Sequence, residues 1–201
     1  AFGLASVGLT ALLARRLWPD TPDRAGLAAL VLASNAVLLI YGSATMFDTM
    51  LTTATLAAIL ALIAMHRIPG LLPTLGLGAA LALGVYAKGP VILVHVLPVA
   101  ILYPLWADRT TRVGLWPWYR GIALAILVAL ALVGLWLGPA LVLGGAEYRA
   151  DVLWRQSAGR MVNAFGHDRP SWFFAALLPV RAWPWGWSSA ALAAMTPRRR
   201  V

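Results

Sequence analysis

Residues Gly121–Leu143, GIALAILVALALVGLWLGPALVL, form a long apolar run without a charged residue. A helix needs about 20 mostly apolar residues to cross the hydrocarbon layer of a membrane, and this stretch supplies them. The rest of the chain agrees, since 61% of the 201 residues are hydrophobic and only 11% are charged. This composition is too apolar for a soluble domain and indicates an integral membrane protein.

Further apolar segments predict an all-α, polytopic helix bundle with about six or seven membrane segments. Lys88-Gly89-Pro90 is the only link between the fourth and fifth segments, which predicts a tight helical hairpin. Prolines inside several segments predict kinks whose freed backbone groups neighbouring helices must satisfy. The predicted segments are Phe2–Ala14, Ala25–Tyr41, Phe47–Met65, Leu71–Ala87, Val91–Trp106, Gly121–Leu143 and Trp172–Met195.

We interpret residues 1–201 as a single transmembrane domain and as an internal part of a longer protein. The chain opens inside an apolar segment and ends abruptly at PRRRV. It contains no cysteine, which excludes a disulfide framework and a thiolate metal site. The net charge of +9 does not indicate a nucleic-acid partner, because the basic residues are scattered among apolar spans.

The cations predict the orientation of the chain in the membrane. If the segments alternate in direction, one side receives ten cations and the other side five. The richer side is predicted to be the cytoplasm, so the chain reads as a multi-pass protein of the inner (plasma) membrane. The loop at about 144–171 is then extracytoplasmic and is expected to carry short helices. An interfacial aromatic belt is predicted at the cytoplasmic edge, formed by Trp18, Trp106, Trp116, Trp118 and Tyr119.

The outer loop carries cations, although the orientation rule predicts that cations gather in the cytoplasmic loops. Arg155, Arg160 and Arg169 lie in RQSAGRMVNAFGHDRPSW, residues 155–172, together with His167. Arginine suits phosphate because its guanidinium makes paired, charge-assisted hydrogen bonds. The pattern favours an anionic ligand, and a lipid phosphate in particular. A solvated amphipathic helix on the membrane surface would explain the same residues.

Two more ionisable residues are predicted at the same outer face, and each has an ordinary explanation. Asp48 opens a helix, where a carboxylate caps free N–H groups and opposes the helix dipole. Lys88 could be a lysine that marks the membrane interface. It is, however, the only lysine among sixteen cations, which favours a need for a compact ammonium. A carboxylate such as Asp48 could also bind a metal or a sugar hydroxyl.

Several segments in order carry a family resemblance. Gly42 to Asp48 opens a span as G-x-x-x-x-x-D, and LGVYAKGP at residues 83–90 closes an outer hairpin. An R-x-x-x-x-R then precedes HDRPSWFF, residues 167–174, which leads into a span with Pro-Trp. This order resembles the polytopic GT-C glycosyltransferases, in the group that contains the lipid A aminoarabinose transferase and the protein O-mannosyltransferases of the cell envelope.

The resemblance implies a transferase that takes a sugar from a polyprenyl-phosphate donor on the extracytoplasmic side and passes it to a lipid or protein acceptor. It implies that Lys88 and Arg160, together with Arg155, contact the donor phosphate. It implies that His167 binds a metal or the sugar, and it leaves a divalent metal open as a cofactor. Asp48 matches a recurrent acidic position near the cavity.

The family's catalytic acidic residue lies in a loop before the segment that matches Phe2–Ala14. The catalytic residue is therefore unknown here, with Asp48 as the only candidate, and residues 1–201 alone are expected to lack the catalytic loop. A transporter or flippase for an anionic or lipid-linked substrate would also place ionisable residues inside the bundle. A scaffold whose outer arginines bind lipid head groups is a further alternative.

The orientation predicts which loops a reagent outside the cell can reach. Cysteines introduced at Thr111 and Ala158 are expected to differ, because the first lies in a predicted cytoplasmic loop and the second in the outer loop. An impermeant thiol reagent applied to intact cells should label position 158 and spare position 111. The reverse labelling would overturn the orientation.

Overall fold

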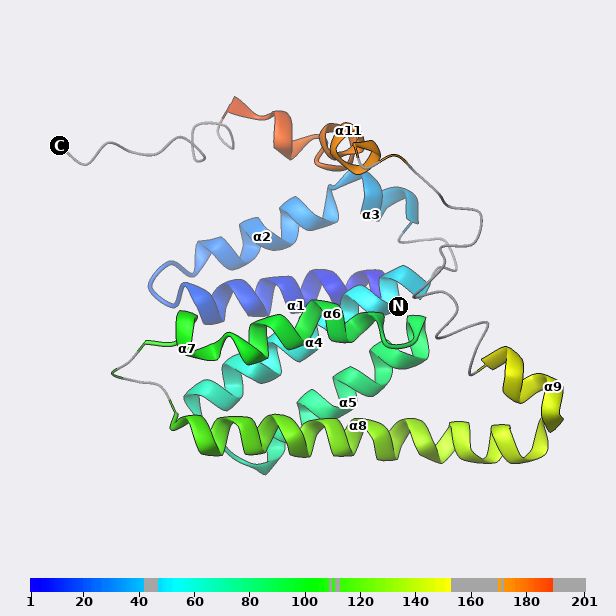
Figure 1. Ribbon diagram of the computed structural model, residues 1–201. Helices are drawn as coiled ribbons and strands as arrows, with labels where there is room; N and C mark the ends of the chain where they lie inside the picture. The colour runs from blue at the N-terminus through cyan, green and yellow to red at the C-terminus, as the bar shows by residue number, and fades with distance from the viewer. Residues whose placement is uncertain (42–46, 109, 111–112, 153–169, 171, 190–201) are drawn as a thin grey trace. The chain divides into compact units, whose positions relative to one another are not determined.

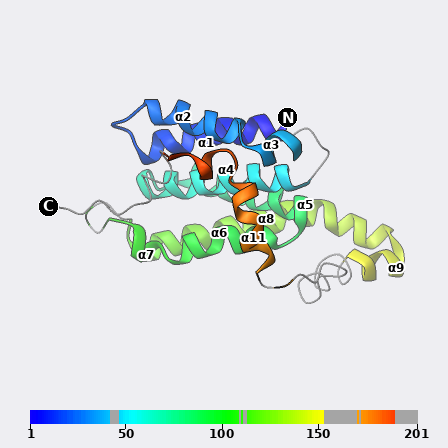
Figure 2. The same ribbon diagram turned by 90° about the horizontal axis from the view of Figure 1, so that it is seen from above.

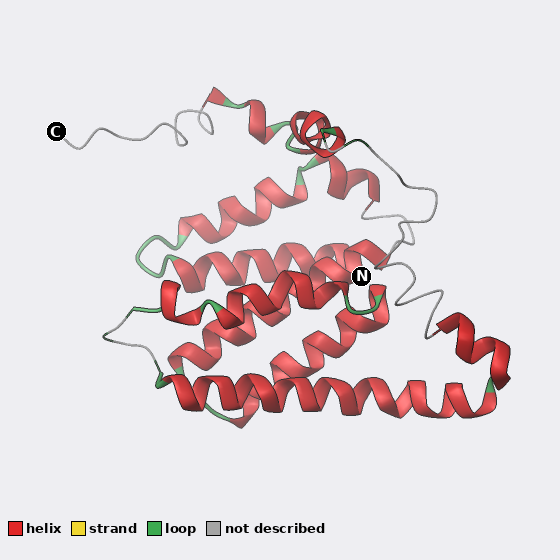
Figure 3. Cartoon of the chain, viewed as in Figure 1, coloured by secondary structure: helices red, strands yellow, loops and turns green. Residues whose placement is uncertain are grey.

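The computed structural model describes residues 1–41, 47–108, 110, 113–152, 170 and 172–189. All regular elements in these ranges are helices (Figure 3). Contacts divide the chain into two compact units, Ala1–Met46 with Gly166–Val201, and Phe47–Phe165. The interpretation of the chain as one transmembrane domain stays a prediction.

The first unit is built on two neighbouring helices, α1 (Phe2–Leu17) and α2 (Asp23–Ala33), which pack against each other (Figure 1). The predicted segment 25–41 does not form one helix, because it is interrupted after α2 and resumes as α3 (Ala36–Tyr41). The interruption is held by polar contacts from the C-terminal part of the chain, α11 (Phe173–Arg181) and the 3-10 turn η2 (Trp185–Trp187).

Those contacts are specific. Asn35 donates its side-chain amide to the carbonyl of Arg181 at 3.1 Å, and the indole of Trp185 donates to the hydroxyl of Ser34 at 2.9 Å. The polar side chains at this interruption are thus paired with a backbone carbonyl and with another side chain.

The second unit is a helical bundle around α5 (Leu71–Lys88). In Figures 1 and 2, α5 lies between α4 (Phe47–Arg67) and α8 (Leu115–Leu143), and it contacts both. The tight hairpin predicted at residues 88–90 is confirmed, because α6 (Val91–Ile101) follows at once and packs on α4 and α5. A short α7 (Tyr103–Trp106) follows α6, and α9 (Gly145–Ala150) follows α8.

The break between α6 and α7 shows how a neighbouring helix satisfies a proline-disrupted backbone. Pro104 has no N–H to donate to the carbonyl of Ala100 one turn earlier. That carbonyl instead accepts the indole N–H of Trp118 at 2.9 Å, and the carbonyl of Ile101 accepts the hydroxyl of Tyr119 at 2.8 Å. Both donors come from the first turns of α8, so the predicted requirement for outside partners is met here.

The prediction that Trp118 belongs to an interfacial aromatic belt is wrong. Its side chain is only 1% exposed, and its ring stacks on Tyr103 with centroids 3.8 Å apart. The hydroxyl of Tyr103 also accepts the backbone N–H of Val113 at 2.8 Å and hydrogen-bonds to His66 at 2.9 Å. These aromatic residues therefore fix the end of the second unit where α4, α7 and α8 meet.

Three helices of the described chain, α4, α5 and α8, are long and apolar enough to cross a membrane, and α6 is a shorter apolar helix. The all-α, polytopic membrane fold predicted from the sequence is confirmed. The expected number of about six or seven membrane segments stays a prediction, because other predicted segments are divided or shorter among the described residues.

Close packing of α5 on α8 depends on one glycine. A Cβ built on Gly78 would lie 2.7 Å from the side chain of Val128 and 2.8 Å from the carbonyl oxygen of Ala125. The second atom belongs to the backbone, so it cannot move aside as a flexible side chain would. Small residues at such contacts let helix backbones approach each other in a membrane.

Gly78→Ala is expected to destabilise the intact protein by about 1–3 kcal/mol, because the added methyl group overpacks the α5–α8 contact. Gly76→Ala is the matched control: it lies in the same helix, and a Cβ there would meet nothing within 4 Å. This control should be neutral or stabilising, because alanine favours the helix. Thermal unfolding in detergent measures both, and equal tolerance of the two changes would contradict the packing argument.

Candidate functional site

The start of α4 and the end of α5 lie next to each other, and they bring Asp48 and Lys88 together. The ammonium of Lys88 lies 2.5 Å from a carboxylate oxygen of Asp48 and donates a hydrogen bond to it. The sequence predicted both residues at one face of the membrane, and the structure adds that they form an ion pair.

The dipoles of α4 and α5 favour the charges of Asp48 and Lys88 at these helix ends. Asp48 lies in the first turn of α4, where the partial positive charge of a helix N-terminus favours a carboxylate. Lys88 lies in the last turn of α5, where the partial negative charge favours a cation. Asp48 therefore makes two favourable interactions: it opposes the dipole of α4, and it binds the ammonium of Lys88.

The hairpin after Lys88 depends on Gly89. Its φ of 64° lies in the region that L side chains rarely adopt, and its N–H donates to the carbonyl of Val85 at 2.7 Å. This closes α5 directly after Lys88 and lets Pro90 precede α6. The lysine is therefore carried on the last residue of a rigid helix and not on a loop.

The ion pair contributes little to stability by itself. The Lys88 side chain is 41% exposed and that of Asp48 is 50% exposed. Pairs this accessible contribute about 0–1 kcal/mol in water. The contact therefore adds little to the stability of the bundle, and it leaves both charged groups accessible to a ligand.

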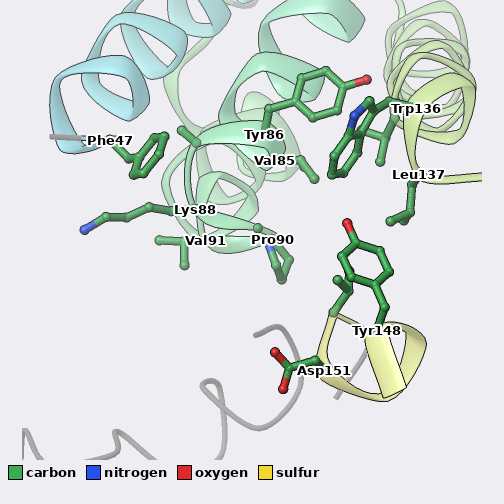
Figure 4. A pocket seen from close by; sticks show the side chains of 14 residues that line it. Phe47, Val85, Tyr86, Lys88, Pro90, Val91, Trp136, Leu137, Tyr148 and Asp151 are labelled. Atoms are coloured by element: carbon green, nitrogen blue, oxygen red, sulfur yellow. The ribbon is translucent and has the colours of Figure 1, made fainter. Parts of the chain in front are cut away.

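Lys88 lines a cavity of about 720 Å³, which Figure 4 shows from close by. This volume lies within the 300–1,000 Å³ range of typical ligand pockets. Most of the wall is apolar, and its polar side chains come from the hairpin, from α5 and from the segment around α9. The lining residues are Phe47, Val85, Tyr86, Ala87, Lys88, Gly89, Pro90, Val91, Val133, Trp136, Leu137, Tyr148, Asp151 and Val152.

Aromatic side chains from α5, α8 and α9 form part of this wall. The hydroxyl of Tyr86 donates to the carbonyl of Leu132 at 2.5 Å, which fixes its ring against α8. Tyr86 and Trp136 meet edge to face, with centroids 6.2 Å apart and an interplanar angle of 86°. In Figure 4, Tyr148 extends from α9 toward this pair, and the carboxylate of Asp151 lies below Pro90.

Part of this site could be predicted from the sequence. The predicted residues Lys88 and Asp48 are brought together by the structure, while Arg155, Arg160 and His167 lie outside the described residues.

Tyr86, Trp136, Tyr148 and Asp151 line the cavity and were not predicted. Tyr86 lies only two residues before Lys88 and could have been included as its neighbour. Trp136, Tyr148 and Asp151 carry no local signal, because only the packing of α5, α8 and α9 brings them to the cavity.

A metal site was left open by the resemblance. In the part of the chain that the structure describes, no group of three or more His, Asp or Glu side chains could hold a metal ion. His167, which the resemblance implies as a metal or sugar ligand, is not among those residues, so this role stays a prediction.

Comparison with known proteins supports the family resemblance. The chain is 35% identical over 188 residues to the undecaprenyl phosphate-alpha-4-amino-4-deoxy-L-arabinose arabinosyl transferase of Pseudomonas paraeruginosa. It is 34% identical over 188 residues to the protein of the same name from Pseudomonas aeruginosa.

Each of these alignments covers 90% of this chain and 32% of the relative, so the chain spans about a third of the length of the curated relatives it matches. No protein-family model matches the chain, and no solved structure matches it. The resemblance to the aminoarabinose transferases is confirmed as a sequence similarity along nearly the whole chain.

Proposed function

We propose that this chain is the part of a membrane glycosyltransferase that binds the phosphate of a polyprenyl-phosphate sugar donor, with Lys88 as the central phosphate ligand. The observation that carries the proposal is the placement of Lys88. It stands at the edge of the cavity, on the last residue of α5, in a chain similar to arabinosyl transferases that use an undecaprenyl phosphate sugar.

Lys88 suits the chemistry of such a donor. When the bond between the sugar and the phosphate breaks, negative charge grows on the departing phosphate. A cation fixed in a mostly apolar site stabilises that charge without reorganising during the reaction. Arg160 and Arg155 from the outer loop are proposed to supply further charge-assisted hydrogen bonds to the same phosphate.

Asp48 is proposed as the positioning residue for Lys88. An ammonium has three N–H donors, so a lysine held by one carboxylate can still donate to phosphate oxygens. The 2.5 Å contact keeps the flexible lysine side chain in one place before the donor arrives. It also engages the carboxylate, which makes Asp48 a weaker candidate for the base that activates the acceptor.

The donor is proposed to be undecaprenyl phosphate carrying an aminoarabinose, as in the names of the relatives. The acceptor is proposed to be a lipid or a protein at the extracytoplasmic face of the inner membrane. His167 is proposed to contact the sugar or a divalent metal.

Lys88→Ala in the intact protein tests the proposal. Loss of a charge-assisted contact should weaken transfer from the lipid-linked donor by about 10- to 150-fold, from about 1.5–3 kcal/mol. Radiolabelled sugar transfer in membranes measures the effect, with the amount of folded protein kept equal between variants.

Arg67→Ala is the control for that experiment. Arg67 is the last residue of α4, about 30 Å along the helix from Asp48 at 1.5 Å per residue. It removes a cation without touching the proposed site, so transfer should be unchanged. Equal turnover by the Lys88 and Arg67 variants would show that Lys88 does not bind the donor phosphate.

A further inference from the structure

We propose that Trp136, Tyr148 and Asp151 form the subsite that holds the sugar ring of the donor, separate from the phosphate contact at Lys88. This inference rests on the proposed function. It concerns residues that neither the motifs of the sequence nor the names of the relatives point to, and it follows from what lines the cavity.

The aromatic wall offers a fixed face to a ligand. Trp136 is 57% exposed although it lines the cavity, and Tyr86, held by its hydrogen bond to Leu132, supports it edge to face. Aromatic side chains provide a large contact area with few rotatable bonds, so little conformational entropy is lost when a ligand packs on them. The C–H face of a sugar ring is a suitable partner for such a surface.

Tyr148 completes the aromatic wall from the opposite side. A Cβ built on Gly144 would lie 2.3 Å from the Tyr148 ring, so this ring packs tightly over the turn between α8 and α9. In Figure 4 the hydroxyl of Tyr148 points into the cavity, toward Trp136 and Leu137. A phenol hydroxyl both donates and accepts hydrogen bonds, as recognition of a sugar hydroxyl requires.

Asp151 indicates which part of the donor lies nearby. It follows Tyr148 by three residues along a helical backbone, so the two side chains share one side of this segment. A carboxylate repels a phosphate and is costly beside a lipid tail. A carboxylate can accept hydrogen bonds at both of its oxygens, so Asp151 can bind a ligand even when another group of the protein donates to it. A sugar hydroxyl or a sugar ammonium group fits this position.

The polarity of the cavity therefore matches that of a lipid-linked sugar. In Figure 4 the Lys88 side chain extends away from Trp136 and Tyr148, whereas Asp151 and these two aromatic residues line the cavity from α8 and the segment around α9. The phosphate would then contact the cation of Lys88. The sugar ring would pack on the aromatic rings of Trp136 and Tyr148 and donate hydrogen bonds to Asp151.

The affinity of the protein is measured for two lipids, undecaprenyl phosphate and the same lipid carrying an aminoarabinose. A residue of the sugar subsite affects only the second affinity, whereas a phosphate ligand affects both. The intact protein in nanodiscs is compared with Trp136→Ala, Asp151→Ala and Lys88→Ala. Trp136→Ala and Asp151→Ala should each weaken binding of the sugar-bearing lipid by about tenfold and leave binding of the bare lipid phosphate unchanged. Lys88→Ala should weaken both.

Matched controls lie in the same elements. Trp116→Ala removes a 77% exposed tryptophan from the other end of α8, and Glu147→Gln neutralises an exposed carboxylate of α9 that does not line the cavity. Both should leave both affinities unchanged. Asp151→Asn then identifies the bound group, because an amide retains most of the affinity for a hydroxyl and little for an ammonium.

Equal losses for the two lipids in Trp136→Ala and Asp151→Ala would assign these residues to the lipid and overturn the sugar subsite, as would no loss for either. Failure of the unaltered protein to bind bare undecaprenyl phosphate would instead overturn the proposed function, and the subsite with it.

Discussion

The contact between Lys88 and Asp48 is the interaction on which the site depends. It joins the end of α5 to the start of α4, two helices that pack along their lengths in the second unit. Both residues lie where the dipole of their own helix favours their charge. The contact therefore places one cation at a defined point of a largely apolar bundle, with little effect on stability.

The need to satisfy backbone groups within a membrane accounts for much of the surrounding structure. Where Pro104 removes a helix hydrogen bond, α8 supplies Trp118 to the freed carbonyl of Ala100. Where α2 and α3 are separated, the N–H of Ala36 donates to the carbonyl of Trp183 at 3.4 Å, and the side-chain amide of Asn35 donates to the carbonyl of Arg181. Broken helices are tolerated in apolar surroundings only when such donors are available. The break after α6 thus provides two hydrogen bonds to α8, the helix that carries Trp136.

Much of the fold could be predicted from the sequence. The long apolar run of α8 and the Lys88-Gly89-Pro90 link determine a span and a hairpin through local rules, and both are found. The apolar pattern could not show the division of the segment 25–41 into α2 and α3, because the polar pairs there involve residues more than 140 positions apart. The burial of Trp118 was missed because it depends on contacts with α6 and α7, which the apolar pattern does not show. An aromatic residue near a span end resembles an interfacial anchor until its stacking on Tyr103 is known.

In the candidate site, too, the features with a local sequence signal were predicted, and those that depend on helix packing were not. Lys88 and Asp48 were found because the orientation places both at the same outer face, and because Lys88 is the only lysine among sixteen cations. Their pairing and the aromatic wall were not found, because both depend on how separate helices pack. Sequence similarity to arabinosyl transferases over 90% of the chain supports the chemistry assigned to Lys88, and the cavity beside it supplies the geometry.

The most direct measurement is a structure of the intact protein with undecaprenyl phosphate bound. The proposed function predicts the lipid phosphate within about 2.7–2.9 Å of the Lys88 ammonium, the usual length of a charge-assisted hydrogen bond. Asp48 should still lie beside the same lysine. A phosphate bound elsewhere, with the cavity beside Lys88 left without lipid, would contradict the account.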